Sequence, residues 1–204
     1  NLGADSERLT AWICTQLSMG RGRGQGVRGA VQALCVLLRH DDARISFSRH
    51  GGVGYLTKII RMQGGDTSMA QLLYELCFCL WSVSLCDEAR QDFLSCGAVP
   101  ILAQQVAAAT SEKVIRVSLA ALKHLTEGEV MSFNSEMIGC GLPKTLSNMK
   151  ARKWSDPDIA DDVEALDKAK ERVMALVDSE HKDVQRHALQ CVSKIMVNKW
   201  EFIR

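Results

Sequence analysis

Apolar residues recur along this chain at the three- and four-residue spacings of an α-helix. The longest stripe comprises Leu72, Leu73, Leu76, Cys77, Leu80 and Trp81. It leaves its helix little polar surface, which is typical of an inner helix packed between neighbours. Further stripes comprise Val31, Leu34, Cys35 and Leu38, then Ile115, Leu119, Leu122 and Leu125, and finally Val184, Ala188, Cys191, Val192 and Ile195. Together the stripes predict one stacked core.

An internal repeat organises these helices. Residues 41–47 (DDARISF) align with residues 87–93 (DEARQDF) at an offset of 46. A weaker third copy aligns residues 96–100 (CGAVP) with residues 140–143 (CGLP) at an offset of 44. Periods of about 40 to 47 residues are typical of armadillo and HEAT units. Because strand signals are nearly absent, we expect an all-α fold, an armadillo/HEAT-like right-handed superhelical solenoid.

Glycine occurs at equivalent positions in successive copies of the repeat. A helix that ends just before Gly51, Gly97 or Gly141 can place the glycine in the left-handed conformation without a steric cost. Pro100 and Pro143 suit the first turn of the helix that follows, where a missing N–H removes no hydrogen bond. Loops are expected at residues 20–26, 63–68, 110–111 and 154–157.

The periodicity of the repeat is interrupted in the last quarter of the chain. Residues 155–158 (SDPD) resemble a helix start with an acidic first turn, and a charged helix is predicted from Ile159 to Leu176. We therefore expect a boundary and a hinge within Trp154–Asp178. Residues 1–154 would form the armadillo-like helical repeats, and residues 155–204 the hinge and a C-terminal helical portion.

Composition narrows the class of protein. The chain has 204 residues, of which 47% are hydrophobic, and its 25 basic and 24 acidic residues nearly cancel. This balance leaves no excess of positive charge that would attract nucleic acid or anionic lipid, so we expect no nucleic-acid partner. No apolar run approaches the roughly 20 residues that span a bilayer, and the first residues lack signal character. We expect no direct membrane insertion.

The cysteines and histidines do not suggest a metal site. Of the eight cysteines, those within apolar helical patterns are expected to be reduced core thiols. Cys77 and Cys79 should point to different faces of one helix, whereas structural zinc needs ligands that converge. The histidines show no H-E-x-x-H spacing and lie mostly beside helix ends. We expect no metal and no cofactor.

Catalytic patterns are also missing. Residues 20–26 (GRGRGQG) fit neither a Walker phosphate loop nor a dinucleotide-binding fingerprint, and a flexible linker is the simpler interpretation. The acid pairs at 41–42 and 87–88 recur at equivalent turns, so their role is structural. We expect them to cap the helices that carry Phe47 and Phe93 and to pair with the arginine that follows. No catalytic residue is predicted, and the chain is not expected to be an enzyme.

Stacked helical repeats usually hold other proteins along their surface. Armadillo proteins that carry nuclear cargo use ladders in which a Trp is followed one turn later by an Asn. Here the residue four positions after Trp81 is Leu85. A cargo-peptide groove of that type is therefore disfavoured, and the partner stays open.

Several segments resemble one family. Residues 10–39 resemble its Trp-containing helix, glycine loop and Leu-Leu-Arg ending, and residues 111–116 (SEKVIR) its Glu-Lys-Val-x-Arg helix start. Residues 154–162 are similar to its acidic Asp-x-Asp-Ile-x-x-Asp segment. Residues 184–189 (VQRHAL) and 194–201 (KIMVNKWE) resemble its C-terminal ending. The family is the H subunit of the vacuolar-type proton ATPase.

The resemblance implies a non-catalytic structural and regulatory subunit. It would bridge the soluble ATPase sector and the membrane sector as part of a hetero-oligomeric complex, and regulate coupled ATP hydrolysis and proton transport. The implied partners are the peripheral stalk subunits E and G, the cytosolic domain of subunit a, and the B subunit with the rotor in the inhibited state. The implied location is the cytosolic face of vacuolar and endolysosomal membranes, and the cytosol after detachment.

Several alternatives stay open at this stage. Family members are about twice this length or more, and near residues 168–172 the chain is either shortened or joined from separate segments. The alternative function is an armadillo-type adaptor with an unrelated client. Trp200 could either pack on its own helix or contact a partner. The candidate partner-binding residues are Arg21, Arg23, Lys150, Arg152, Lys153, Lys199, Trp200 and Arg204.

Overall fold

The computed structural model describes residues 2–19, 25–63, 69–127, 130–177 and 186. Every regular element in these ranges is a helix, so the predicted all-α class is confirmed. The elements are α1 (Leu2–Met19), α2 (Gln25–Leu37), α3 (Asp41–Arg49), α4 (Gly52–Gln63), α5 (Ala70–Ser84), the 3-10 helix η2 (Asp87–Ala89), α6 (Arg90–Ser95), α7 (Ala98–Ala108), α8 (Glu112–Thr126), α9 (Val130–Gly139), α10 (Leu142–Lys150) and α11 (Pro157–Val177).

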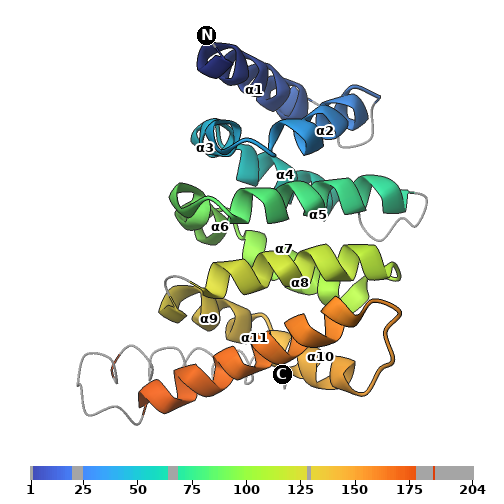
Figure 1. Cartoon of the computed structure of the whole chain (residues 1–204), viewed down its shortest axis with the longest axis vertical. Helices are drawn as coiled ribbons and strands as arrows, with labels where there is room; N and C mark the ends of the chain where they lie inside the picture. Colours follow the sequence, from blue (N-terminus) through green and yellow to red (C-terminus); the bar gives the residue numbers. More distant parts are fainter. Residues whose placement is uncertain (1, 20–24, 64–68, 128–129, 178–185, 187–204) are drawn as a thin grey trace, which may run out of the picture.

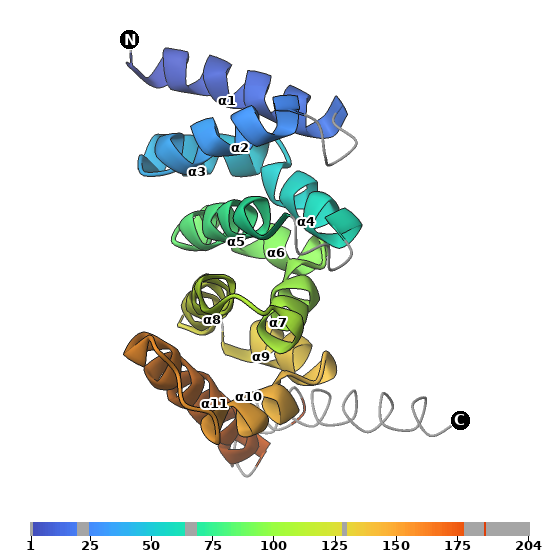
Figure 2. The ribbon, with the colours of Figure 1, turned by 90° about the vertical axis from the view of Figure 1, so that its right-hand side faces the viewer.

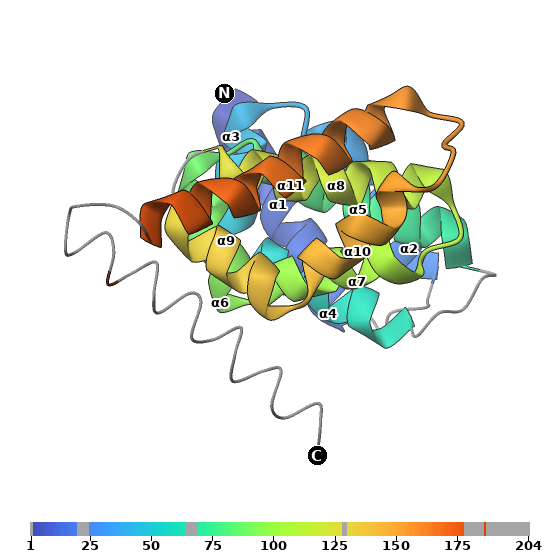
Figure 3. The same ribbon diagram turned by 90° about the horizontal axis from the view of Figure 1, so that it is seen from below.

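The helices stack along one axis, from α1 at one end to α10 and α11 at the other (Figure 1). Three-helix units follow one another as α3–α5, α6–α8 and α9–α11, and α1 and α2 precede them. Viewed from the side, α5 and α8 lie on one side of the stack and α4 and α7 on the other (Figure 2). The view along the axis shows the same two layers, α5, α8 and α11 against α4, α7 and α10 (Figure 3). This arrangement is an armadillo-type solenoid.

The predicted left-handed glycines are confirmed. Gly51, Gly97 and Gly141 have φ values of 72°, 66° and 79°, and they are the positive-φ residues of the described ranges. Each follows the short first helix of a unit and immediately precedes the second. Pro143 occupies the first turn of α10, where its missing N–H removes no intrahelical bond. The same backbone device therefore redirects the chain once in every unit.

The acidic residues at the repeat turns do not cap their helices as predicted. The N-cap positions belong to His40 and Cys86, and neither makes a side-chain capping hydrogen bond. Asp41 comes one residue later and accepts a hydrogen bond from Arg44 at 2.6 Å. The capping prediction was wrong because each helix starts at the first acid, which therefore lies inside the first turn. The predicted pairing with the following arginine is confirmed.

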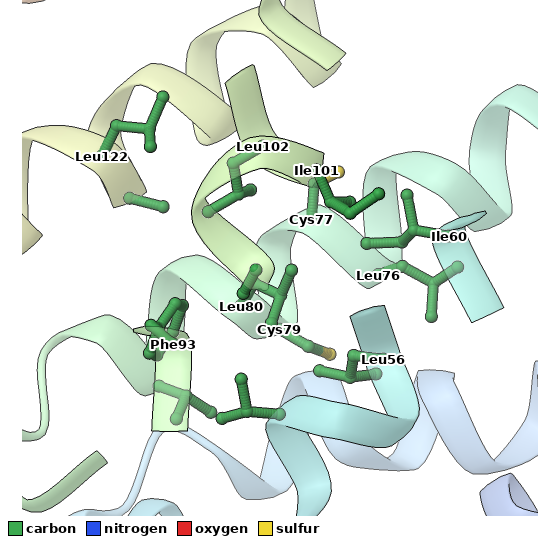
Figure 4. Packing of buried hydrophobic residues seen from close by; sticks show 14 of the residues in the cluster. Leu56, Ile60, Leu76, Cys77, Cys79, Leu80, Phe93, Ile101, Leu102 and Leu122 are labelled. Carbon is green, nitrogen blue, oxygen red and sulfur yellow. The ribbon is translucent and has the colours of Figure 1, made fainter. Parts of the chain in front are cut away.

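The inner helices bury the predicted stripes. Leu76 and Leu80 of α5 are fully buried between Leu56 of α4 and Leu102 of α7 (Figure 4). Cys77 and Cys79 project in opposite directions from α5 in the same view, as predicted. The α8 stripe is also buried, and so are most residues of the α2 stripe. The stripe predicted at residues 184–195 lies outside the described residues.

Helix α11 is packed onto the preceding helices. It begins at Pro157, after the predicted loop, and spans the predicted charged helix. Ile159, Val163 and Leu166 are at most 4% exposed, because this face of α11 lies against α8, α9 and α10. Among the described helices, none combines the length and the apolar character that a membrane span requires.

Candidate partner-binding surfaces

Helix α5 carries a row of partly exposed aromatic residues. It packs on α2, α4 and α8, and it also contacts α3 and η2. Tyr74, Phe78 and Trp81 follow one another along α5 at spacings of four and three residues, so they share one side of the helix. We refer to these three residues as the α5 ridge.

The rings of the α5 ridge support one another. The centroids of Tyr74 and Phe78 lie 6.1 Å apart, with an angle of 40° between the ring planes. Those of Phe78 and Trp81 lie 5.3 Å apart at 54°. Tilted pairs at these distances are favourable because the positive edge of one ring meets the negative face of the next. The ridge is therefore an ordered aromatic surface before any partner binds.

The two helices that flank α5 also carry apolar residues with solvent-exposed area. Val36 of α2 is 61% exposed, and Val117 of α8 is half-buried. Glu75 supplies a negative charge on α5 and accepts a hydrogen bond from Gln71 at 2.9 Å. Exposed aromatic and aliphatic groups next to a few charges are the usual composition of a protein interface. The surface suits an amphipathic partner.

The α5 ridge was not predicted from the sequence. Trp81 was predicted to belong to the buried stripe, whereas its side chain is half-buried and lies at the edge of that stripe. Tyr74 and Phe78 were not singled out. Their spacing with Trp81 was the available signal, because three aromatic residues on one side of a helix form a stripe of their own, offset from the leucine stripe.

A groove lies between α10 and α11. Its volume is about 350 Å³. The groove is lined by Met149, Lys150, Arg152, Trp154, Ala160, Val163, Glu164, Asp167 and Lys168. The Trp154 indole donates a hydrogen bond to the Met149 carbonyl at 3.2 Å, which fixes the ring at the wall of the groove. The Arg152 guanidinium lies 4.3 Å from the centre of the same ring, a cation–π contact.

Three of the predicted contact residues lie at or beside this groove. Lys150 forms an ion pair with Asp167 of α11, so its charge is balanced within the chain. Arg152 is exposed and stacks on Trp154, and Lys153 is exposed. These residues remain predicted contacts. The other candidates, Arg21, Arg23, Lys199, Trp200 and Arg204, lie outside the described residues.

Ion pairs join α8 to the start of α11. Arg116 bonds to both Asp156 and Asp158, the first at 3.2 Å. Lys123 bonds to Asp162 at 2.8 Å. The hydrogen bond to Asp162 raises the pKa of Lys123, against the opposing effect of burial. Asp162 is only 7% exposed, so this pair links the two helices at a partly buried point.

The described residues contain no group of three or more His, Cys, Asp or Glu side chains arranged to hold a metal ion. His50 contacts the Ser46 carbonyl through Nδ1 at 2.8 Å, and His124 pairs with Glu127 at 3.2 Å. Both are local contacts at helix ends.

Comparisons with known proteins point to one family. Two sequence profiles, both for the H subunit of the V-ATPase, match residues 4–169 and 154–200. The chain is 36% identical over 160 residues to a probable V-type proton ATPase H subunit from Oryza sativa subsp. japonica, an alignment that covers 78% of this chain and 34% of that protein. It is 31% identical over 162 residues to the V-type proton ATPase H subunit from Dictyostelium discoideum, with coverages of 79% and 36%. The chain thus spans about a third of the length of these curated relatives.

Solved structures with a similar fold include designed armadillo repeat proteins. A computationally designed armadillo protein for modular peptide recognition superposes with a TM-score of 0.66 at 15% identity, covering 90% of this chain and 81% of that one. A second designed armadillo repeat protein gives a TM-score of 0.64 at 16% identity, with coverages of 91% and 81%. At this level of identity the likeness shows the fold alone.

Proposed function

The chain belongs to the V-ATPase H subunit family, whose profile matches residues 4–169, and from that premise we propose that it is a non-catalytic structural and regulatory subunit of the vacuolar-type proton-pumping ATPase. It bridges the soluble ATPase sector and the membrane sector and regulates coupled ATP hydrolysis and proton transport. Catalysis then lies in partner subunits. The α5 ridge supports this proposal, because its aromatic rings are partly exposed and aromatic residues are enriched among the hot spots of protein interfaces.

In this proposal the α5 ridge contacts the peripheral stalk formed by subunits E and G. A pair of stalk helices would present apolar side chains at helical spacing, which can pack between the rings of the ridge and the exposed Val36. The aromatic rings lose little conformational entropy on binding because they already contact each other. A partner helix with apolar residues on one side and basic residues beside them would also pair with Glu75.

The C-terminal portion of the chain has a second role in the proposal. It contacts the cytosolic domain of subunit a in the assembled pump, and the B subunit with the rotor in the inhibited state. A hinge between the two portions would separate these interfaces, within Trp154–Asp178. The burial of Ile159, Val163 and Leu166 favours a hinge on the C-terminal side of Leu166, because movement there would leave these contacts intact.

The proposed location follows from the proposed partners. The subunit lies at the cytosolic face of vacuolar and endolysosomal membranes, held there by other subunits. After the soluble sector detaches, the chain is found in the cytosol. Arg152 and Lys153, which are exposed beside the groove between α10 and α11, remain candidates for contacts with subunit a.

The proposal is tested by measuring binding of the purified chain to the stalk heterodimer of subunits E and G, with biolayer interferometry. The chain is expected to bind. Phe78→Ala removes the central ring of the α5 ridge, and truncation of an interface hot spot costs about 2 kcal/mol or more. The dissociation constant should therefore rise by about 30-fold. Circular dichroism confirms that the variant is folded.

Met62→Ala is the matched control. Met62 is 47% exposed on α4, in the opposite layer of the solenoid, so the substitution removes a similar apolar area away from the ridge. It should leave the affinity unchanged. Equal affinities of Phe78→Ala and the unmodified chain would refute the role of the ridge. Capture of unrelated clients from a cytosol-plus-membrane lysate, without any ATPase subunit, would instead favour the adaptor function.

A further inference from the structure

Two cysteines from neighbouring inner helices meet inside the solenoid. The sulfur atoms of Cys35 on α2 and Cys79 on α5 lie 3.5 Å apart. They lie 44 positions apart in the sequence, Cys35 on the helix that precedes the first three-helix unit and Cys79 on the last helix of that unit. A disulfide has an S–S bond of about 2.05 Å, so the sulfurs would need to approach by about 1.5 Å. The α2 and α5 backbones are already in contact along this junction.

The two thiols have different environments. Cys79 is fully buried, and burial raises the pKa of its thiol. Cys35 is half-buried, and the hydrogen bond from Cys79 lowers its pKa. The pair thus combines a half-buried cysteine whose thiol ionises more readily with a fully buried thiol at contact distance. The adjacent Cys77 points to the opposite side of α5 and does not take part.

We propose that Cys35 and Cys79 form an oxidation site, at which hydrogen peroxide converts the two thiols into a disulfide that joins α2 to α5. The inference rests on the geometry of the pair and does not depend on the function proposed above. Its position matters because Val36 and Phe78 are the chain neighbours of the two cysteines, so the crosslink would join the helix that carries Val36 to the helix that carries the α5 ridge.

The chemistry balances in two steps. The Cys35 thiolate attacks one oxygen of the peroxide, the O–O bond breaks, and the departing hydroxide takes up a proton to form water. The product at Cys35 is a sulfenic acid. The Cys79 sulfur then attacks the Cys35 sulfur, the S–O bond breaks, and a second water leaves with the Cys79 proton. Two thiols are oxidised by two electrons, and one peroxide is reduced to two waters.

The disulfide should be detectable by mass and by stability. The intact chain loses two hydrogen atoms on oxidation and regains them with dithiothreitol. Because the crosslink would close a loop between α2 and α5, the unfolding temperature should rise by several °C, an order-of-magnitude expectation for a native-like disulfide. Trypsin without reductant should release a linked pair of peptides, residues 29–39 with residues 62–90.

The experiment treats the purified chain with graded hydrogen peroxide and maps the linked peptides. Residues 29–39 contain one cysteine, Cys35, whereas residues 62–90 contain Cys77, Cys79 and Cys86. Fragmentation of the linked peptide in the mass spectrometer assigns the partner sulfur in the unmodified chain. This readout does not require any variant to fold.

Variants then provide a second readout. Cys79→Ser should abolish the linked peptide and the rise in unfolding temperature, whereas Cys77→Ser, in the same tryptic peptide, should retain both. Two results would overturn the proposal: a linked peptide that persists in Cys79→Ser, or oxidation of the exposed Cys140 without any linkage of Cys35 at the same peroxide dose.

Discussion

A glycine in the left-handed conformation precedes the second helix of each unit. Adding a single methyl group by substitution to alanine tests whether this position requires glycine. Gly97→Ala adds a Cβ at a residue whose φ is 66°. The nearest heavy atom to that Cβ would be Nη2 of Arg61 at 3.6 Å, an ordinary van der Waals contact. The substitution therefore changes the backbone preference and leaves the packing as it is.

The magnitude follows from two opposing terms. A non-glycine residue in the left-handed region costs about 1 to 2 kcal/mol. The alanine also restricts the unfolded chain, which returns about 0.4 to 1 kcal/mol. We expect a net loss of about 1 kcal/mol in the free energy of unfolding. Gly97→Asn should lose less, because asparagine tolerates this conformation better than alanine.

The assay is urea unfolding at 25 °C, followed by circular dichroism. With a slope of about 1 to 3 kcal/mol per molar urea, the midpoint should fall by about 0.3 to 1 M. Gly51 and Gly141 have the same conformation and no heavy atom within 4 Å of the added Cβ, so their alanine variants should show similar losses. Three similar values would establish that the glycines have equivalent roles.

Gly29→Ala is the matched control. Gly29 lies within α2, has no positive φ, and a Cβ there meets nothing within 4 Å. In a helix interior alanine is more favourable than glycine by about 0.5 to 1 kcal/mol, so this variant should be stabilised. The reasoning would be refuted if Gly97→Ala unfolded at the same urea concentration as the unmodified chain, or if Gly97→Asn lost more than Gly97→Ala.

Three further predictions concern packing, an ion pair and a buried thiol. Gly52→Ala would place its Cβ in steric overlap with the Phe47 ring, so thermal unfolding should reveal a loss of about 1 to 3 kcal/mol in the free energy of unfolding. Asp162→Asn weakens the contact with Lys123, and urea unfolding should show a loss of about 1 kcal/mol at pH 7, since Lys123 is partly exposed. Because the pKa of Lys123 is raised in the fold, this contribution should disappear as the pH rises through that raised pKa. Burial raises the pKa of Cys77 to about 12, so the unfolded chain loses its thiol proton first above pH ~9 and stability should fall from there towards pH 12. With reductant present, Cys77→Ala should make that decline shallower, and an unchanged slope would contradict the assignment.

The repeat architecture was predictable because it depends on local patterns that recur. The aligned acidic turns and the glycines at 51, 97 and 141 marked where each unit turns, and the leucine stripes marked the inner helices. The capping role given to Asp41 and Asp87 was wrong, because helix boundaries shift by one residue without any change in the pattern. Arg44 also donates to the Leu38 carbonyl at 2.8 Å, a contact that composition does not reveal.

The surfaces were harder to predict than the core. Lys150 remains a predicted partner contact, and its ion pair with Asp167 was not predictable because it depends on the angle between α10 and α11. Trp81 was assigned to the core because it lies four positions after the buried Cys77, yet a small rotation of the helix decides whether a ring at the edge of a stripe is covered. The proximity of Cys35 and Cys79 was likewise not predictable from the sequence, because it depends on how α2 and α5 are aligned along their axes.

The side-chain contacts that join successive units span similar stretches of sequence. Ser48 bonds to Asp92 across 44 positions, and Lys123 to Asp162 across 39. Closing these segments costs nearly the same entropy at each junction, because the segments have nearly the same length. Each segment is also much shorter than the whole chain, so a junction can form before the two ends of the chain meet. A protein built this way has a low contact order and can fold outward from any unit that forms first. Adding or removing one unit would alter only the junctions with its neighbours, so the length of such a chain can change while the packing of more distant units stays the same.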